Sequence, residues 1–163
     1  MNTMGSMDTQ SNENFQAEAL NNETTVQSGK KYLIFITDDL RFGVNAEYVV
    51  EILNNHVITP LPMTPDYVCG IFNMRGQIIP ILDIRLKLGK PPIENPLMVV
   101  IRFDGAQAGI LVDSVDQMIE ISDDLLLPMP SKHPQRLVSG MCTLPDGSGT
   151  ILILDCEQLL DHE

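Results

Sequence analysis

The sequence predicts a mainly β fold built from two small β-barrels of about five strands each. Short apolar runs rich in β-branched residues alternate with short turn signals along most of the chain. The pattern also repeats, because residues 32–53 align with residues 98–119 without a gap, and residues 76–88 align with residues 148–160. Five strands per repeat suit a closed or nearly closed barrel, since closure removes exposed sheet edges.

The first 29 residues differ in composition from the rest of the chain. They contain four acidic side chains, no Lys or Arg, and many Asn, Thr, Ser and Gln residues. Such a segment has too little apolar surface to offset the entropy lost on ordering. We therefore expect a disordered acidic tail over residues 1–29 and a folded region over residues 30–163.

The first half of the folded region, about residues 31–90, contains two hairpin patterns and a helix pattern. The hairpins are Tyr32–Thr37 with Leu40–Val44, and Gly70–Met74 with Gln77–Leu82, joined by the turns Asp38-Asp39 and Arg75-Gly76. Between them, Asn45 is a typical N-cap for a short helix in which Val49, Ile52 and Leu53 share one face. The sequence thus predicts a short helix directly after Val44.

The second half, about residues 96–160, repeats this plan. Its hairpins are Leu97–Phe103 with Ala106–Val112, around Asp104-Gly105, and Gly140–Leu144 with Thr150–Leu154. Asp155 is then expected to cap a closing helix that ends at Leu160. Each half is expected to supply one barrel, and an exchange of strands between the halves is left open.

Composition excludes several classes of function. The chain has 163 residues and a formal net charge of −12, so its surface repels phosphate backbones and anionic membranes. No apolar run approaches the roughly 20 residues that span a bilayer, and the first residues do not resemble a secretion signal. Three widely spaced cysteines, Cys69, Cys142 and Cys156, indicate reduced thiols. These features predict a cytoplasmic protein that does not bind nucleic acid or insert into the membrane.

Two aspartates occupy equivalent positions in the repeats. Asp83 and Asp155 each follow an apolar strand, IIPIL and TILIL respectively. The simpler interpretation is that each carboxylate caps the helical turn after its strand. The alternative is a pair of carboxylates facing one cleft, which would make the protein a small-ligand-binding or hydrolytic β-barrel.

Arg75 is the only basic side chain in an otherwise apolar and polar stretch between Cys69 and Ile84. It follows one predicted strand and precedes another, beside Gly76. The sequence leaves two interpretations open: a turn with a solvated guanidinium, or an arginine presented by a rigid turn to a partner carboxylate or carbonyl. Arginine suits the second role, because its planar fork forms two parallel hydrogen bonds.

The stretch NMRGQIIPILDIRLKLG closely resembles the N-x-R-G-x-I-x-P-x-x-D-L-R motif of the CheW family of chemotaxis coupling proteins. Similarity to this family runs from about Lys31 to Leu160. The resemblance implies two five-stranded, SH3-like barrels and no catalysis or cofactor. It also implies an adaptor that couples the cytoplasmic tips of methyl-accepting chemoreceptors to the regulatory domain of a CheA-type histidine kinase, at membrane-associated receptor arrays.

The resemblance further implies a receptor-binding surface in the groove between the barrels. Arg75 matches the arginine of the family motif and is the first choice for receptor contact. The other positions that match this surface are Val49, Glu51, Gly70, Val115, Met118 and Gly140. The two valines and the methionine could instead belong to the core. No catalytic or metal-binding residue is expected.

Overall fold

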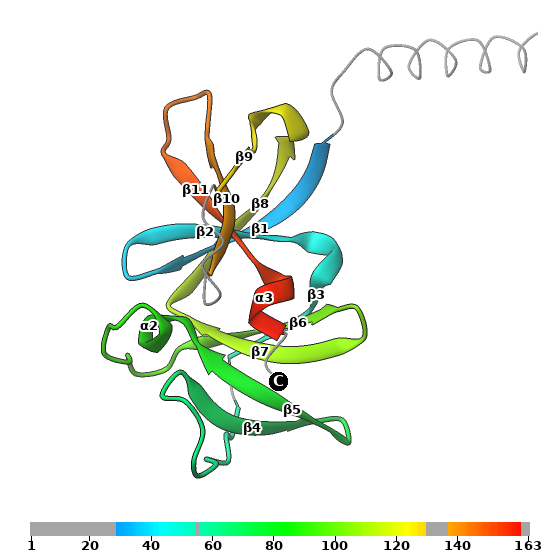
Figure 1. The fold of residues 1–163 in the computed structure, drawn as a ribbon, viewed down its shortest axis with the longest axis vertical. Coiled ribbons are helices and arrows are strands. Elements are labelled where there is room, and N and C mark those ends of the chain that lie inside the picture. The colour runs from blue at the N-terminus through cyan, green and yellow to red at the C-terminus, as the bar shows by residue number, and fades with distance from the viewer. Residues whose placement is uncertain (1–28, 55, 130–136, 161–163) are drawn as a thin grey trace, which may run out of the picture.

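The computed structural model describes residues 29–54, 56–129 and 137–160 as two curved β-sheets stacked on one another (Figure 1). The tail predicted to be disordered lies outside these residues, except for Gly29. Within the described ranges, no helix has the length and apolar character that a membrane crossing requires. The fold is mainly β with a few short helices, as the sequence predicts.

The first sheet has six strands in the order β8-β1-β2-β11-β10-β9 and forms the upper part of Figure 1. Its strands are β1 (Gly29–Thr37), β2 (Leu40–Asn45), β8 (Ser114–Ser122), β9 (Leu127–Pro128), β10 (Val138–Thr143) and β11 (Thr150–Leu154). The helix α3 (Cys156–Leu160) follows β11, and the 3-10 turn η2 (Asp123–Leu125) joins β8 to β9. The β1–β2 hairpin turns through Asp38 and Asp39, whose φ angles are 52° and 65°.

The second sheet has five strands in the order β3-β6-β7-β5-β4 and forms the lower part of Figure 1. Its strands are β3 (Val49–Leu53), β4 (Val68–Met74), β5 (Gln77–Asp83), β6 (Leu97–Phe103) and β7 (Ala106–Val112), and the helix α2 (Ile84–Lys87) follows β5. The predicted hairpins are therefore present, with ends that move by at most a few residues.

The two repeats exchange strands. The chain crosses from the first sheet to the second after β2, through the 3-10 turn η1 (Ala46–Tyr48), and it returns at Asp113, between β7 and β8. The second sheet is therefore continuous in sequence, whereas the first combines strands from both ends of the folded region. Each sheet also contains one parallel pair, β5 with β7 and β2 with β11. Of the two arrangements that the sequence leaves open, the structure has the one with exchanged strands, because long-range pairing decides strand partners.

The helix predicted after Val44 is shorter than expected. Asn45 caps it as predicted, since its side-chain oxygen accepts a hydrogen bond from the Glu47 amide at 2.9 Å. The helical turn ends at Tyr48, and the next five residues form the edge strand β3. Pairing with β6 stabilises this strand through backbone hydrogen bonds, and such tertiary contacts override a weak helical pattern.

Neither sheet is closed by strand pairing among the described residues. In the second sheet, however, the chain beyond β3 returns to the opposite edge, where Thr59 and Ile71 of β4 exchange backbone hydrogen bonds of 2.9 and 2.8 Å. In the first sheet, η2 carries the chain from β8 to β9, which pairs with β10. Each sheet is therefore nearly closed. The chain segment that runs from one edge strand to the other spans the gap, which no ladder of hydrogen bonds between the two edge strands closes.

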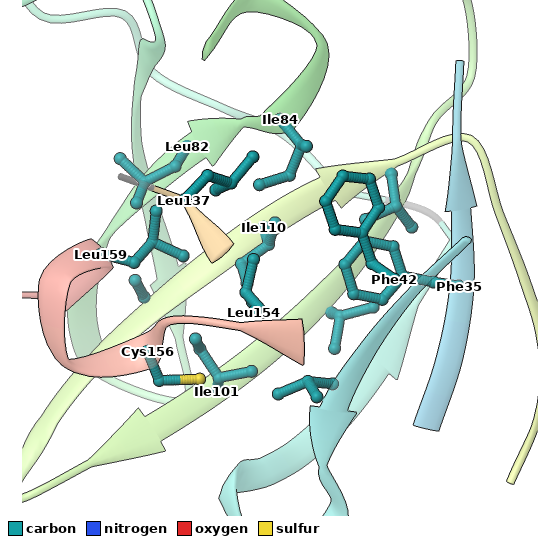
Figure 2. Packing of buried hydrophobic residues seen from close by; sticks show 14 of the residues in the cluster. Phe35, Phe42, Leu82, Ile84, Ile101, Ile110, Leu137, Leu154, Cys156 and Leu159 are labelled. Carbon is teal, nitrogen blue, oxygen red and sulfur yellow. The ribbon is translucent and has the colours of Figure 1, made fainter. Parts of the chain in front are cut away.

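Three apolar cores stabilise the fold. The largest lies between them and receives side chains from both, including Phe35 and Phe42, whose rings stack with centroids 5.3 Å apart (Figure 2). A smaller core lies inside each curved sheet, around Ile34 in the first and Ile81 in the second. Because the central core is shared, neither sheet can bury its apolar surface without the other.

Candidate receptor-binding surface

Arg75 lies at the tip of the β4–β5 hairpin. Arg75 and Gly76 both have positive φ angles, 52° and 90°, as a two-residue hairpin turn of this hand requires. The Asn73 side chain stabilises the turn, because its Oδ1 accepts a hydrogen bond from the Gly76 amide at 2.9 Å. The Arg75 side chain is 68% exposed. The turn therefore fixes the backbone of this arginine and leaves its guanidinium accessible.

Glu51, on strand β3, forms a two-point ion pair with Arg75. Arg75 Nη1 lies 2.7 Å from Glu51 Oε1, and Nη2 lies 2.8 Å from Oε2. The pair joins the hairpin tip to the opposite edge of the sheet, so it depends on the sheet's curvature. The structure thus brings two of the predicted site residues into direct contact, although they are distant in sequence.

The ion pair changes the titration of Glu51. The hydrogen bond from Arg75, followed by its positive charge, holds the pKa of the Glu51 carboxyl below its ordinary value. We expect Arg75→Ala to raise this pKa towards the ordinary value, as measured by NMR titration of the side-chain carboxyl carbon. In the native chain, the stabilisation from this pair is present above the unfolded-state pKa and is lost as the pH falls through the folded-state pKa.

A suitable control for this titration is Arg102→Ala, which removes an exposed arginine from β6 of the same sheet. It should leave the pKa of Glu51 unchanged. If Arg75→Ala also leaves it unchanged, the ion pair is not formed in solution. Neither variant should lower the thermal midpoint appreciably, because exposed ion pairs contribute little to stability.

Gly70 and Gly140 allow close approaches at equivalent places in the two sheets. Each follows a register shift in its strand, at Val68/Gly70 in β4 and Val138/Gly140 in β10. A Cβ atom at Gly70 would lie 2.1 Å from the Thr59 carbonyl oxygen, and one at Gly140 would lie 2.8 Å from the Leu127 carbonyl oxygen. The structure therefore gives both glycines a packing role where the chain returns to the sheet edge.

Gly140→Ala is expected to lower the free energy of unfolding by about 1–3 kcal/mol, because the added methyl group forces β9 away from β10. Urea denaturation followed by circular dichroism would measure the loss. Ser139→Ala is the control, since it changes the neighbouring residue without adding atoms. Equal stability of Gly140→Ala and the native protein would contradict the close packing of Leu127 on this strand.

The apolar site residues have different environments. Val49 on β3 and Val115 on β8 are half-buried and pack against the central core, so their side chains have a clear structural role. Met118 on β8 is 50% exposed and is available for contact with a partner. Arg75, Glu51, Val49 and Gly70 belong to the second sheet, whereas Val115, Met118 and Gly140 belong to the first.

Two exposed isoleucines on the strands next to this ion pair, β3 and β5, do not follow from the sequence interpretation given above. Ile52 follows Glu51 on β3 and is 41% exposed, and Ile78 on β5 pairs with Asn73 and is 58% exposed. The assignment of VVEIL to a helix hid Ile52, because it placed this residue on an inward face. Reading the same letters with the two-residue period of a strand would have placed Val50 and Ile52 outward.

Asp83 and Asp155 act as helix caps, as the simpler interpretation predicts. Asp83 Oδ1 accepts a hydrogen bond from the Arg85 amide at 2.9 Å, and Asp155 Oδ1 accepts one from the Gln158 amide at 3.0 Å. Burial raises the pKa of Asp83, and the hydrogen bonds of its cap oppose this effect. Among the described residues, no group of three His, Cys, Asp or Glu side chains is placed to hold a metal ion.

Comparison with known proteins places this geometry in a family. The CheW-like domain matches residues 31–163. Chemotaxis protein CheW of Klebsiella aerogenes is 29% identical over 141 residues, which cover 83% of this chain and 84% of that protein. Protein FrzA of Myxococcus xanthus is 33% identical over 136 residues, which cover 80% of this chain and 85% of that protein.

A solved structure agrees with these sequence matches. The crystal structure of the scaffolding protein TtCheW from Thermoanaerobacter tengcongensis superposes with a TM-score of 0.70 and 27% sequence identity. The match covers 78% of this chain and 90% of that chain. Family, curated relatives and fold coincide over the region that carries Arg75 and Glu51, and the chain belongs to the CheW-like domain family.

Proposed function

We propose that this protein is a non-catalytic adaptor that couples methyl-accepting chemoreceptors to a CheA-type histidine kinase in chemotaxis signalling. The observation that carries the proposal is the likeness of nearly the whole described region to a solved scaffolding protein. The chemotaxis protein CheW of Klebsiella aerogenes, named above as a relative, supports it. The capping role of Asp83 and Asp155 also favours an adaptor over a hydrolase, because both carboxylates already stabilise helix ends.

The receptor contact is proposed to centre on Arg75. Its guanidinium is exposed and oriented by Glu51, while Ile52 on β3 and Ile78 on β5 are exposed apolar side chains of the same sheet. Such a surface fits an amphipathic helix, whose apolar positions contact the isoleucines and whose polar groups accept hydrogen bonds from the arginine. Met118, which is exposed on the first sheet, is proposed as a further contact residue, and Val49 and Val115 pack against the central core.

The kinase contact is proposed to use another part of the adaptor, so that one molecule bridges both partners. Signalling then requires only that receptor conformations differ in their affinity for this bridge. Individual contacts of moderate strength suffice, because many adaptors in an array bind at high effective concentration.

Arg75→Ala is expected to lower receptor affinity by about 10-fold or more, since a charge-assisted hydrogen bond at an interface contributes about 1.5–3 kcal/mol. The measurement is co-sedimentation of the full chain with receptor signalling fragments in vesicles, with and without the kinase. Arg102→Ala, in which an exposed arginine of β6 is removed, is the matched control and should bind like the native protein.

Two results would count against different parts of the proposal. Native affinity of Arg75→Ala for receptor fragments would remove this arginine from the contact while leaving the adaptor function standing. Failure of the native chain to sediment with any combination of receptor and kinase would overturn the adaptor function itself.

A further inference from the structure

The two places where the chain crosses between the sheets are built differently. The second crossing, at Asp113, is filled by Arg85 of α2, whose side chain is only 14% exposed. Arg85 Nη1 lies 2.8 Å from Asp113 Oδ2, and Nη2 lies 3.5 Å from Asp38 Oδ1. Arg85 Nε also donates to the Pro91 carbonyl at 2.6 Å. A guanidinium therefore occupies this junction and pairs with two carboxylates, and the Lys90 ammonium also lies 3.5 Å from Asp38 Oδ2.

The repeat alignment identifies the corresponding residues at the first crossing, at η1. Arg85 and its two carboxylate partners each have a counterpart in the other repeat. The counterparts follow from the alignment of residues 32–53 with 98–119 and of residues 76–88 with 148–160. Asp38 corresponds to Asp104, Asp113 to Glu47, and Arg85 to Glu157. The two acidic positions are acidic at both crossings, but the arginine is replaced by a glutamate. At these three aligned positions, the first crossing therefore has three carboxylates, whereas the second has two carboxylates and a guanidinium.

A groove lies at this first crossing, between η1 and α3. It consists of a hollow of about 410 Å³ and a neighbouring hollow of about 260 Å³, which share Phe103 and Glu157 as lining residues. Tyr48 lines the larger hollow and Asp104 the smaller one. The rings of Tyr48 and Phe103 meet edge to face, with centroids 5.1 Å apart. We call this feature the η1–α3 groove.

The charges around the groove are mostly negative. Glu157 is exposed, and Tyr48 lies within the electrostatic influence of both Glu47 and Glu157, which add to the effect of burial in raising the pKa of its hydroxyl. Lys30 is the basic side chain among the lining residues, and its ammonium lies 3.3 Å from Asp123 Oδ1. Asp155 also lines the groove, but it caps α3.

We propose that the η1–α3 groove binds an arginine side chain supplied by a protein partner. The guanidinium takes the place that Arg85 takes at the other crossing, with Glu157 and Asp104 as its acceptors and Glu47 adding to the negative field. The methylene stem lies against the rings of Tyr48 and Phe103, which also attract a cation. Arginine is favoured over lysine, because it bonds two carboxylates in one plane and is less costly to desolvate.

This interaction is separate from the receptor contact proposed above. The groove is formed by η1, α3 and the β6–β7 turn, whereas Arg75 and Glu51 lie at the β4–β5 turn and on β3. The proposal rests on the internal comparison of the two crossings, in which equivalent acidic positions already bind a guanidinium. It therefore stands or fails independently of the adaptor function.

The test uses the full chain labelled with ¹⁵N and the probe N-acetyl-L-arginine amide. We expect saturable shifts of the amide signals of Asn45–Tyr48 and Asp155–Leu160. The citrulline analogue, which has the same shape without the charge, should produce no saturable shift, and the lysine analogue should bind more weakly. Arg75→Ala should bind the arginine probe like the native chain.

Glu157→Arg supplies the decisive variant. Its new guanidinium is expected to pair with Asp104 or Glu47, to raise the thermal midpoint and to weaken probe binding by about 10-fold or more. Glu157→Gln should weaken binding less and leave the midpoint nearly unchanged. Absence of saturable shifts, equal shifts with citrulline or lysine, or unaltered binding by Glu157→Arg would each overturn the proposal. A lowered midpoint in Glu157→Arg would overturn the equivalence of the crossings on which it rests.

Discussion

Replacing Gly70 by alanine is expected to lower the free energy of unfolding by about 3–5 kcal/mol, a large share of the total for a domain of this size. Two effects combine at this position. The φ angle is 152°, in a region that residues with a Cβ atom rarely adopt. In addition, the new Cβ would lie 2.1 Å from the Thr59 carbonyl oxygen and 2.9 Å from the Pro60 Cα. Both neighbours are backbone atoms, so the clash can be relieved only by moving the chain.

Gly105→Ala separates the two effects. Gly105 has a φ angle of 85°, but a Cβ atom there meets nothing within 4 Å. This variant should lose only about 1–2 kcal/mol, the cost of the left-handed backbone conformation. Urea denaturation of both variants measures the difference. A Gly70→Ala loss no larger than that of Gly105→Ala would show that the segment at Thr59 does not pack against β4 as the structure describes.

Replacing Arg85 by alanine is expected to cost about 2–3 kcal/mol of unfolding free energy, because the carboxylates of Asp113 and Asp38 lose their shared partner. Asp113 is the residue at which the chain returns to the first sheet, and its Oδ2 also accepts a hydrogen bond from the Asp38 amide at 2.9 Å. Its Oδ1 is buried and has no hydrogen-bond partner among the described residues. Removing Arg85 would therefore leave a poorly solvated charge at the junction between the sheets.

Arg41→Ala is the matched control for this experiment. Arg41 also pairs with an aspartate, Asp116, at 3.4 Å, but both side chains are more exposed than Arg85. Its loss should cost less than about 1 kcal/mol. Adding Asp113→Asn to Arg85→Ala should recover part of the stability, because it removes the unpaired charge. Equal losses for Arg85→Ala and Arg41→Ala would show that the junction does not depend on the Arg85 network.

The sequence predicted the hairpins well, because their signals are local. Asp38-Asp39, Arg75-Gly76 and Asp104-Gly105 all adopt positive φ angles, and each connects two strands of the expected length. The helix caps at Asn45, Asp83 and Asp155 are also local, because each side chain bonds an amide two or three residues ahead. In each case a few adjacent residues contain the physical cause of the structure.

The exchange of strands and the ion pair could not be predicted in this way. The repeat shows that two units exist. The alignment does not indicate whether the β1–β2 hairpin shares a sheet with the other strands of its own repeat or with strands of the second repeat. Strand β3 shows the same limit, since its partner β6 is supplied by the second repeat. Glu51 meets Arg75 only because the sheet curves, and nothing in the local sequence specifies that curvature.

The discontinuous first sheet has a consequence for synthesis of the chain. Phe42 of β2 pairs with Leu152 of β11, so the β1–β2 hairpin cannot join its complete sheet until Leu152 has left the ribosome. The five-stranded sheet, in contrast, is complete once Val112 has emerged. During this interval the hairpin displays the apolar residues Leu33 and Phe35 without their final cover. Translation thus favours assembly of the second sheet before the first. A chaperone that binds nascent chains would bind the exposed apolar residues of the β1–β2 hairpin.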